Sequence, residues 1–150
     1  MKKIAIASLI ALAATAASAV EVGVTTTRDY SGATDRNSGG ITVGQSVGKV
    51  GVTAGFERFT TGNNDQDRYS LVGSYNVAKV GAVTLAAKAG VAYLNNQNTT
   101  DGYALTVGAG ATLPLTKTVS ATLDVARQYG QDRVSAFDGN RVTAGLKFNF

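Results

Sequence analysis

The chain ends in the stretch RVTAGLKFNF, residues 141–150. From Val142 onward, every second residue is apolar (Val, Ala, Leu, Phe, Phe), and the residues of the other set are Arg, Thr, Gly, Lys and Asn. Alternation with a period of two predicts a β-strand that has one face in an apolar medium and the other in a polar one. In a soluble protein the apolar medium is the core, whereas in a membrane barrel it is lipid. The stretch fits both cases, so the rest of the chain has to decide between them.

The N-terminus has the composition of an export signal. Two lysines at positions 2 and 3 precede an apolar run at residues 4–14, and Ala17-Ser18-Ala19 follows as an A-x-A cleavage site. These three regions are typical of a secretory signal peptide. A transmembrane anchor is the alternative, but the run is shorter than the roughly 20 residues that a spanning helix needs. We therefore predict a signal peptide at residues 1–19 and one exported domain at residues 20–150.

The composition excludes several classes of function. The chain has no cysteine, so disulfides do not hold the exported domain together, and no histidine, which removes His-based catalysis and His metal sites. Removing Lys2 and Lys3 lowers the net charge from +4 to +2, and no basic cluster indicates nucleic-acid binding. The stretch NNDQD, residues 63–67, lacks the spacing and the final Glu of an EF-hand loop. We expect no enzymatic activity, no cofactor, no metal and no nucleic-acid partner.

Alternating runs recur along the whole exported domain. They predict eight strands, most of them about as long as the 9–11 residues that a tilted strand needs to cross a bilayer. The predicted strands are Val20–Tyr30, Gly40–Val47, Val50–Phe59, Arg68–Val77, Val83–Leu94, Gly102–Leu113, Thr118–Tyr129 and Asn140–Phe150. The connections alternate between long ones (residues 31–39, 60–67, 95–101 and 130–139) and short ones (48–49, 78–81 and 114–117, with the single proline, Pro114). An up-and-down barrel with both termini at one end produces this order.

Tyrosines gather at one end of the predicted strands. Five of them lie where a strand meets a long connection, in the apolar phase of the strand: Tyr30, Tyr69, Tyr93, Tyr103 and Tyr129. Tyrosine prefers the membrane–water boundary because its ring is apolar and its hydroxyl is polar. β-Propensity alone explains tyrosine in strands but not its position at one end. We therefore predict an aromatic girdle there, with Tyr75, Phe148 and Phe150 at the opposite rim.

The leader, the eight strands, the girdle and the final stretch VTAGLKFNF together resemble small eight-stranded outer-membrane barrels of the OmpA/OmpX type. The resemblance covers the whole exported domain and implies an all-β fold, an eight-stranded antiparallel up-and-down transmembrane β-barrel. It also implies a monomer in the outer membrane of a Gram-negative bacterium, in contact with outer-membrane lipid and lipopolysaccharide. In such proteins a terminal aromatic preceded by alternate apolar residues is the signal for the barrel-assembly machinery, and Leu146, Phe148 and Phe150 match it. The chain has no tryptophan, which is common in such girdles, so no subfamily is indicated.

The inward phase of the predicted strands carries the charges. In an antiparallel barrel each acid lies at the height of a base, and the predicted pairs are Glu21 with Lys147, Asp29 with Arg141, Glu57 with Arg68, and Lys88 with Asp124. An eight-stranded barrel is only wide enough for side chains to fill, and buried charges are costly unless paired. We therefore predict a structural barrel whose lumen is plugged by charge pairs. The alternative is a narrow channel for ions or small solutes, opened when pairs such as Lys88 and Asp124 exchange partners, because many inward residues are glycine or serine.

Three arginines interrupt the outward apolar phase near the outer ends of their strands: Arg28, Arg58 and Arg127. Arginine forms bidentate bonds with phosphate, so we predict that they hold lipopolysaccharide phosphates. Simple snorkelling of the side chains toward water is the alternative. Two readings without a membrane also stay open at this point. One is an exported soluble barrel that binds an apolar ligand, as lipocalins do, and the other is a fibre-forming β-protein.

Overall fold

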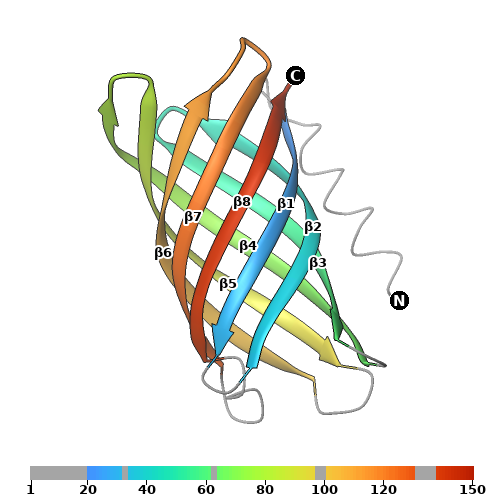
Figure 1. Cartoon of the computed structure of the whole chain (residues 1–150). Coiled ribbons are helices and arrows are strands. Elements are labelled where there is room, and N and C mark those ends of the chain that lie inside the picture. Colours follow the sequence, from blue (N-terminus) through green and yellow to red (C-terminus); the bar gives the residue numbers. More distant parts are fainter. Residues whose placement is uncertain (1–19, 32–33, 62–63, 97–100, 131–137) are drawn as a thin grey trace.

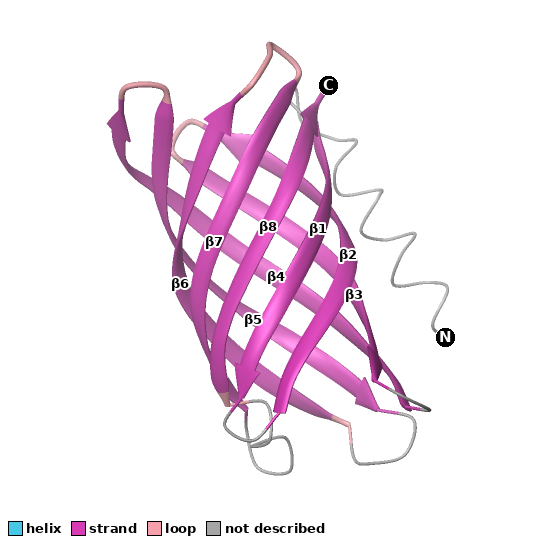
Figure 2. Ribbon diagram, viewed as in Figure 1, coloured by secondary structure: helices cyan, strands magenta, loops and turns pink. Residues whose placement is uncertain are grey.

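The computed structural model describes residues 20–31, 34–61, 64–96, 101–130 and 138–150, and the predicted signal peptide lies outside them. The described ranges form strands and short turns (Figure 2). The strands are β1 (Val20–Ser31), β2 (Thr34–Val47), β3 (Val50–Thr61), β4 (Asn64–Val80), β5 (Val83–Asn96), β6 (Gly102–Pro114), β7 (Val119–Gly130) and β8 (Gly139–Asn149). Within the described part of the chain, no helix is long and apolar enough to cross a membrane.

The sheet closes on itself into a barrel. Each strand pairs antiparallel with the next one in the sequence, and β1 also pairs with β8, as Figure 1 shows. At the chain end, the backbone N–H of Phe150 donates a 3.0 Å hydrogen bond to the carbonyl oxygen of Val20. The predicted eight-stranded antiparallel up-and-down barrel is confirmed. Because β1 and β8 pair with each other, the described sheet offers no edge strand for fibre growth.

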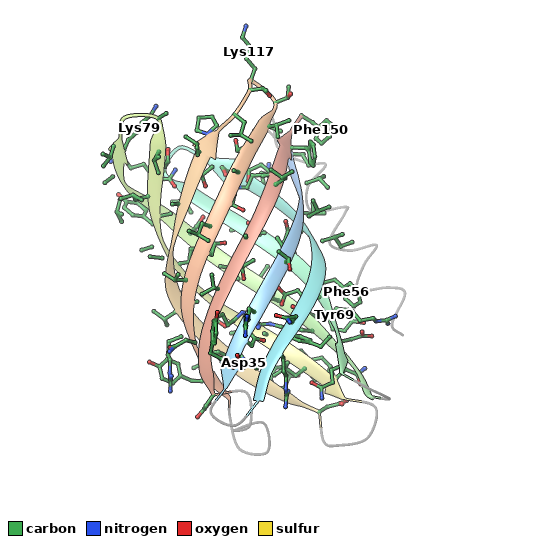
Figure 3. The ribbon with its side chains drawn as sticks, in the orientation of Figure 1. Asp35, Phe56, Tyr69, Lys79, Lys117 and Phe150 are labelled. Atoms are coloured by element: carbon green, nitrogen blue, oxygen red, sulfur yellow. The ribbon has the colours of Figure 1, made fainter. Side chains whose placement is uncertain are left out.

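Three short turns lie at one end of the barrel, together with Val20 and Phe150, and we call this the turn end; the opposite end is the loop end (Figures 1 and 3). Gly48 in the β2–β3 turn and Gly81 in the β4–β5 turn have φ angles of 61° and 59°, which glycine adopts without steric cost. The predicted turn at residues 78–81 is wrong in its position. β4 continues to Val80, with a register shift between Asn76 and Ala78, so Gly81 and Ala82 form the turn.

Two of the predicted long loops are mostly strand. β1 and β2 pair as far as Ser31 and Thr34, and β3 and β4 pair as far as Thr61 and Asn64. The sequence analysis missed these extensions because residues on both faces are polar there, so no period-two pattern marks them, while the backbone ladder continues. Pro114 also lies at the end of β6 rather than in a connection, a position where a missing N–H is tolerated.

The outer surface of the barrel is apolar and the lumen is polar. Large apolar side chains of every strand are exposed on the outside: Val24, Ile41, Val52, Leu71, Val91, Val107, Leu123 and Leu146 are examples. The eight charged residues predicted to point inward are buried or only partly exposed. A lipocalin-like soluble barrel needs the reverse arrangement, so that alternative is wrong. The exposed band has the composition of a surface that faces lipid.

Candidate functional site

Four buried charged side chains meet inside the barrel near the loop end, and we call them the outer charge cluster. They are Asp29 on β1, Glu57 on β3, Arg68 on β4 and Arg141 on β8, and each side chain is at most 9 % exposed. The Nη2 of Arg141 donates to both carboxylate oxygens of Glu57, at 2.9 and 2.7 Å. The Nε of Arg141 lies 3.3 Å from Oδ1 of Asp29, and the Nε of Arg68 lies 3.7 Å from Oε2 of Glu57. Two acids and two bases make the cluster neutral.

The cluster joins two of the predicted pairs into one network. The strand register sets Asp29 opposite Arg141 and Glu57 opposite Arg68, as the sequence predicts. The shortest contact of Glu57 is nevertheless with Arg141, which reaches across the lumen from β8. The sequence sets the height of each residue along the barrel axis. Whether an arginine side chain reaches a residue on the opposite wall depends on the width of the lumen.

Neutral side chains contact the outer charge cluster or pack near it, and they were not among the predicted residues. The hydroxyl of Thr27 donates to Oε1 of Glu57 at 2.8 Å, and the Oε1 of Gln128 accepts from Nη1 of Arg141 at 3.3 Å. Phe59 and Leu94 are the largest apolar side chains of the inward phase, and they are 1 % and 2 % exposed. In the sequence, each is a large apolar residue on a strand face that otherwise carries small or polar residues. Phe59 stands two positions after Glu57 on β3, and Leu94 on β5 lies opposite Arg68 on β4. Large apolar side chains therefore pack inside the lumen beside the charged ones.

A second pair spans strand β6 deeper in the lumen. The Nζ of Lys88 on β5 lies 2.5 Å from Oδ1 of Asp124 on β7, and the two side chains are 27 % and 26 % exposed. Gly110 on β6 lies directly beside this pair. A Cβ at this position would collide with the Asp124 carboxylate and with the Lys88 side chain. Glycine is thus what lets Lys88 and Asp124 meet across the intervening strand.

A third pair lies at the turn end of the lumen. The Nζ of Lys147 is 2.7 Å from Oε2 of Glu21, and the hydroxyl of Ser46 donates to Oε1 of the same carboxylate at 3.2 Å. This pair and the Lys88–Asp124 pair are more exposed than the outer charge cluster. All four predicted pairs are therefore in contact, and the outer charge cluster is the most buried of them.

The lumen holds a cavity of about 140 Å³. Its lining includes charged groups of the outer charge cluster and of both other pairs, together with small polar side chains: Thr25, Thr42, Thr53, Ser70, Ser74, Thr106, Thr122 and Thr143. A water molecule occupies about 30 Å³ of liquid volume, so the cavity has room for several waters. Its walls supply hydroxyl and charged groups that can hydrogen-bond such water.

The predicted girdle tyrosines lie on the outside toward the loop end. Tyr69, Tyr93 and Tyr103 are cross-strand neighbours on β4, β5 and β6, and the rings of Tyr93 and Tyr103 have centroids 5.2 Å apart. Phe56 extends this row, because the centroid of its ring lies 5.2 Å from that of Tyr69. Figure 3 labels the two residues next to each other. Tyr30 and Tyr129 are exposed on β1 and β7. The sequence analysis missed Phe56 because it searched this rim for tyrosine only.

The residues of the predicted assembly signal follow the outward face of β8. Leu146, Phe148 and Phe150 are all exposed, and Phe150 is 81 % exposed. Phe148 lies opposite Val22 on β1 and Val119 on β7, so the final strand is paired on both sides. Tyr75, also predicted at this rim, is exposed as well.

The three outward arginines share one arrangement. Each guanidinium lies over an aromatic ring: Arg28 over Tyr30 at 5.3 Å, Arg58 over Phe56 at 5.9 Å, and Arg127 over Tyr129 at 5.8 Å. Arg28 forms an ion pair with Asp35 at 2.8 Å, and Arg58 forms a bidentate one with Asp67 at 2.8 and 3.1 Å. Arg127 instead donates to the amide oxygen of Asn140 at 3.4 Å. Two of the three cations are thus partly neutralised by neighbouring carboxylates.

The described residues contain no group of three or more His, Cys, Asp or Glu side chains that could hold a metal ion. Of the NNDQD stretch, residues 64–67 belong to β4, and residue 63 lies outside the described residues.

No protein-family model matches this sequence, and no curated protein matches it either. Solved structures do resemble the fold. Neisserial surface protein A (NspA) has 16 % sequence identity and a TM-score of 0.61, over 88 % of this chain and 96 % of that one. The outer membrane protein OprG from Pseudomonas aeruginosa has 11 % identity and a TM-score of 0.57, over 89 % and 96 % of the two chains. A de novo designed transmembrane β-barrel has 10 % identity and a TM-score of 0.58, over 89 % and 96 %.

The chain therefore has the fold of small eight-stranded outer-membrane barrels. The designed barrel is as similar to this chain as the natural proteins are, so the shared fold carries no particular activity with it. Any function has to be argued from the residues of this chain.

Proposed function

We propose that this protein is a small integral outer-membrane β-barrel with a structural role and a lumen closed by paired charges. One observation carries the proposal: a closed barrel exposes a band of apolar side chains around its outside and holds four acidic and four basic side chains inside, the reverse of a soluble protein. Leu71, Val107 and Leu123 are each more than half exposed, and burial of such side chains in lipid removes them from water. The girdle tyrosines mark the boundary where this band meets water.

The structural role is supported by the way in which the lumen is closed. The outer charge cluster is neutral, nearly inaccessible to solvent and hydrogen-bonded to side chains from several strands. A cluster of this kind links opposite walls of the barrel, and Phe59 and Leu94 are nearly inaccessible to solvent. We propose that its main effect is to hold the barrel in one conformation.

A narrow channel is the second candidate. The cavity is lined by hydroxyl groups, and the Lys88–Asp124 pair is about one quarter exposed, so water has access to part of the lumen. Conduction would require the outer charge cluster to open. The two candidates therefore differ in whether the outer charge cluster opens.

The partners and the location belong to the same proposal. The predicted signal peptide would direct export, and Leu146, Phe148 and Phe150 would present the assembly signal to the barrel-assembly machinery. Outer-membrane lipid would surround a monomer. Of the three outward arginines, Arg127 is the strongest candidate for a lipopolysaccharide phosphate, because Arg28 and Arg58 already bind carboxylates. Replacing all three with Gln and measuring co-purified lipopolysaccharide tests this part.

The proposal as a whole is tested by expressing the full-length chain in a Gram-negative host and isolating its outer membrane. A closed barrel resists SDS in the cold, so the unboiled and boiled samples should migrate differently on a gel. A soluble periplasmic protein with no such shift would contradict the proposal. Once the shift is seen, planar-bilayer recordings separate the candidates: absence of conductance fits the structural barrel, and discrete conductance steps fit the channel.

A further inference from the structure

Each short turn of the barrel carries one lysine. Lys49 lies in the β2–β3 turn, Lys79 precedes the β4–β5 turn, and Lys117 lies in the β6–β7 turn. All three are exposed. Figure 3 shows Lys79 and Lys117 at the same end of the barrel as Phe150, and Asp35 at the other end. We call these three lysines the lysine rim.

The two ends differ in how their exposed charges are balanced. Among the described residues, the acidic side chain at the turn end is Glu21, which points into the lumen and is paired with Lys147. Within the part of the chain that the structure describes, the lysine rim therefore faces no exposed acidic side chain at the turn end. At the loop end the exposed described acids are matched in number by exposed bases: Asp35, Asp101 and Asp138 against Arg28, Arg58 and Arg127. The turn end thus presents a positive rim.

Exposed apolar side chains flank every lysine of the rim. The flanking residues are Val47 and Val50 beside Lys49, Val77 and Val80 beside Lys79, and Leu113 and Leu115 beside Lys117. These side chains continue the lipid-facing surface of the strands up to the turns. An ammonium group beside apolar side chains at the end of a membrane strand lies at the depth of the lipid headgroups, where its methylene stem can stay in the apolar layer.

We propose that the lysine rim binds the phosphates of anionic phospholipids in the leaflet that surrounds the turn end. This inference rests on the proposed membrane location. An anionic lipid layer is favoured over an acidic protein because the lysines are distributed over three hairpins around the barrel. A headgroup layer surrounds all three at once, whereas a folded partner would have to cover the mouth of the barrel. One lysine near an anionic membrane surface favours the anionic environment roughly fivefold.

The test uses the folded protein in vesicles of equal parts phosphatidylcholine and phosphatidylglycerol. Spin-labelled versions of each lipid report, by electron paramagnetic resonance, which one is enriched at the protein surface. We expect a preference for phosphatidylglycerol that falls in K49Q/K79Q/K117Q and is retained in the matched variant K49R/K79R/K117R. In 1 M salt the Debye length is about 3 Å, so the preference of the unchanged protein should also fall.

Two results would overturn the inference. One is an equal preference for phosphatidylglycerol in the unchanged protein and in the Gln variant. If R28Q/R58Q/R127Q then lost this preference, the loop end would be its source. The other is no preference in the unchanged protein at any salt concentration, which would point to an acidic macromolecule instead. The second result needs no variant, so the inference can still be refuted if the Gln variant fails to fold. Failure of the proposed membrane location is a separate outcome, because no heat-dependent gel shift would then appear in any vesicle.

Discussion

Glu57→Gln is the most direct test of whether the outer charge cluster stabilises the barrel. Glu57 accepts a hydrogen bond from Thr27 and two from Arg141, and Arg68 lies 3.7 Å away. Glutamine has nearly the same shape but no charge, so the outer charge cluster changes from neutral to a net charge of one positive unit. Asp29 is then the only carboxylate that faces two buried guanidinium groups.

The magnitude follows from the burial of these groups. Removing one partner of a buried ion pair costs about 3–5 kcal/mol, because the remaining charge is left desolvated. The Gln amide oxygen can still accept one hydrogen bond, so we expect the lower end, about 3 kcal/mol. With a urea dependence of about 1–3 kcal/mol per molar, the unfolding midpoint should fall by about 1–3 M.

The assay is urea unfolding of the protein in lipid vesicles, with the folded fraction measured on unboiled SDS gels. The double variant E57Q/R141Q is the control, because it removes one charge of each sign and so keeps the outer charge cluster neutral. Coupled residues deviate from additivity by about 0.5–3 kcal/mol, so the double variant should lose less stability than the sum of the single ones. If E57Q unfolds within 1 kcal/mol of the unchanged protein, or if the two substitutions add, the cluster does not stabilise the barrel in the way argued above.

Three further predictions separate the outer surface, the packing of the lumen and its closure. Leu123→Arg places a charge on the exposed apolar band and should cost about 2–4 kcal/mol in vesicles, whereas in a soluble barrel it would have little effect. Gly110→Val should destabilise the folded barrel by about 1–3 kcal/mol, because any side chain there displaces the Lys88–Asp124 pair. The matched control in the same urea titration is Gly39→Val, because a Cβ at position 39 meets no other atom within 4 Å. Lys88→Ala/Asp124→Ala should leave vesicles impermeable to potassium in a flux assay, because the outer charge cluster still closes the lumen; rapid leakage would show that this pair is the closure.

The residues that face lipid and the residues that face the lumen could be predicted from the sequence. Side chains alternate between the two faces of a strand, so a period-two pattern encodes the face directly. For the same reason, Tyr93 and Tyr103 could be placed on the outside, and Glu21 and Lys147 at one height inside. These properties depend on positions along single strands and on the pairing of neighbouring strands, both of which the chain order specifies.

Only the tertiary structure decided which side chains meet across the lumen. That Arg141 binds Glu57 more closely than Arg68 does, and that Phe59 and Leu94 pack inside, depends on the width of the closed barrel and on the tilt of its strands. These quantities involve all eight strands together, so no local pattern contains them. The same holds for the extension of β2 back to Thr34: once both faces of a hairpin are in water, the alternation disappears from the sequence, and the backbone hydrogen bonds alone continue the strand.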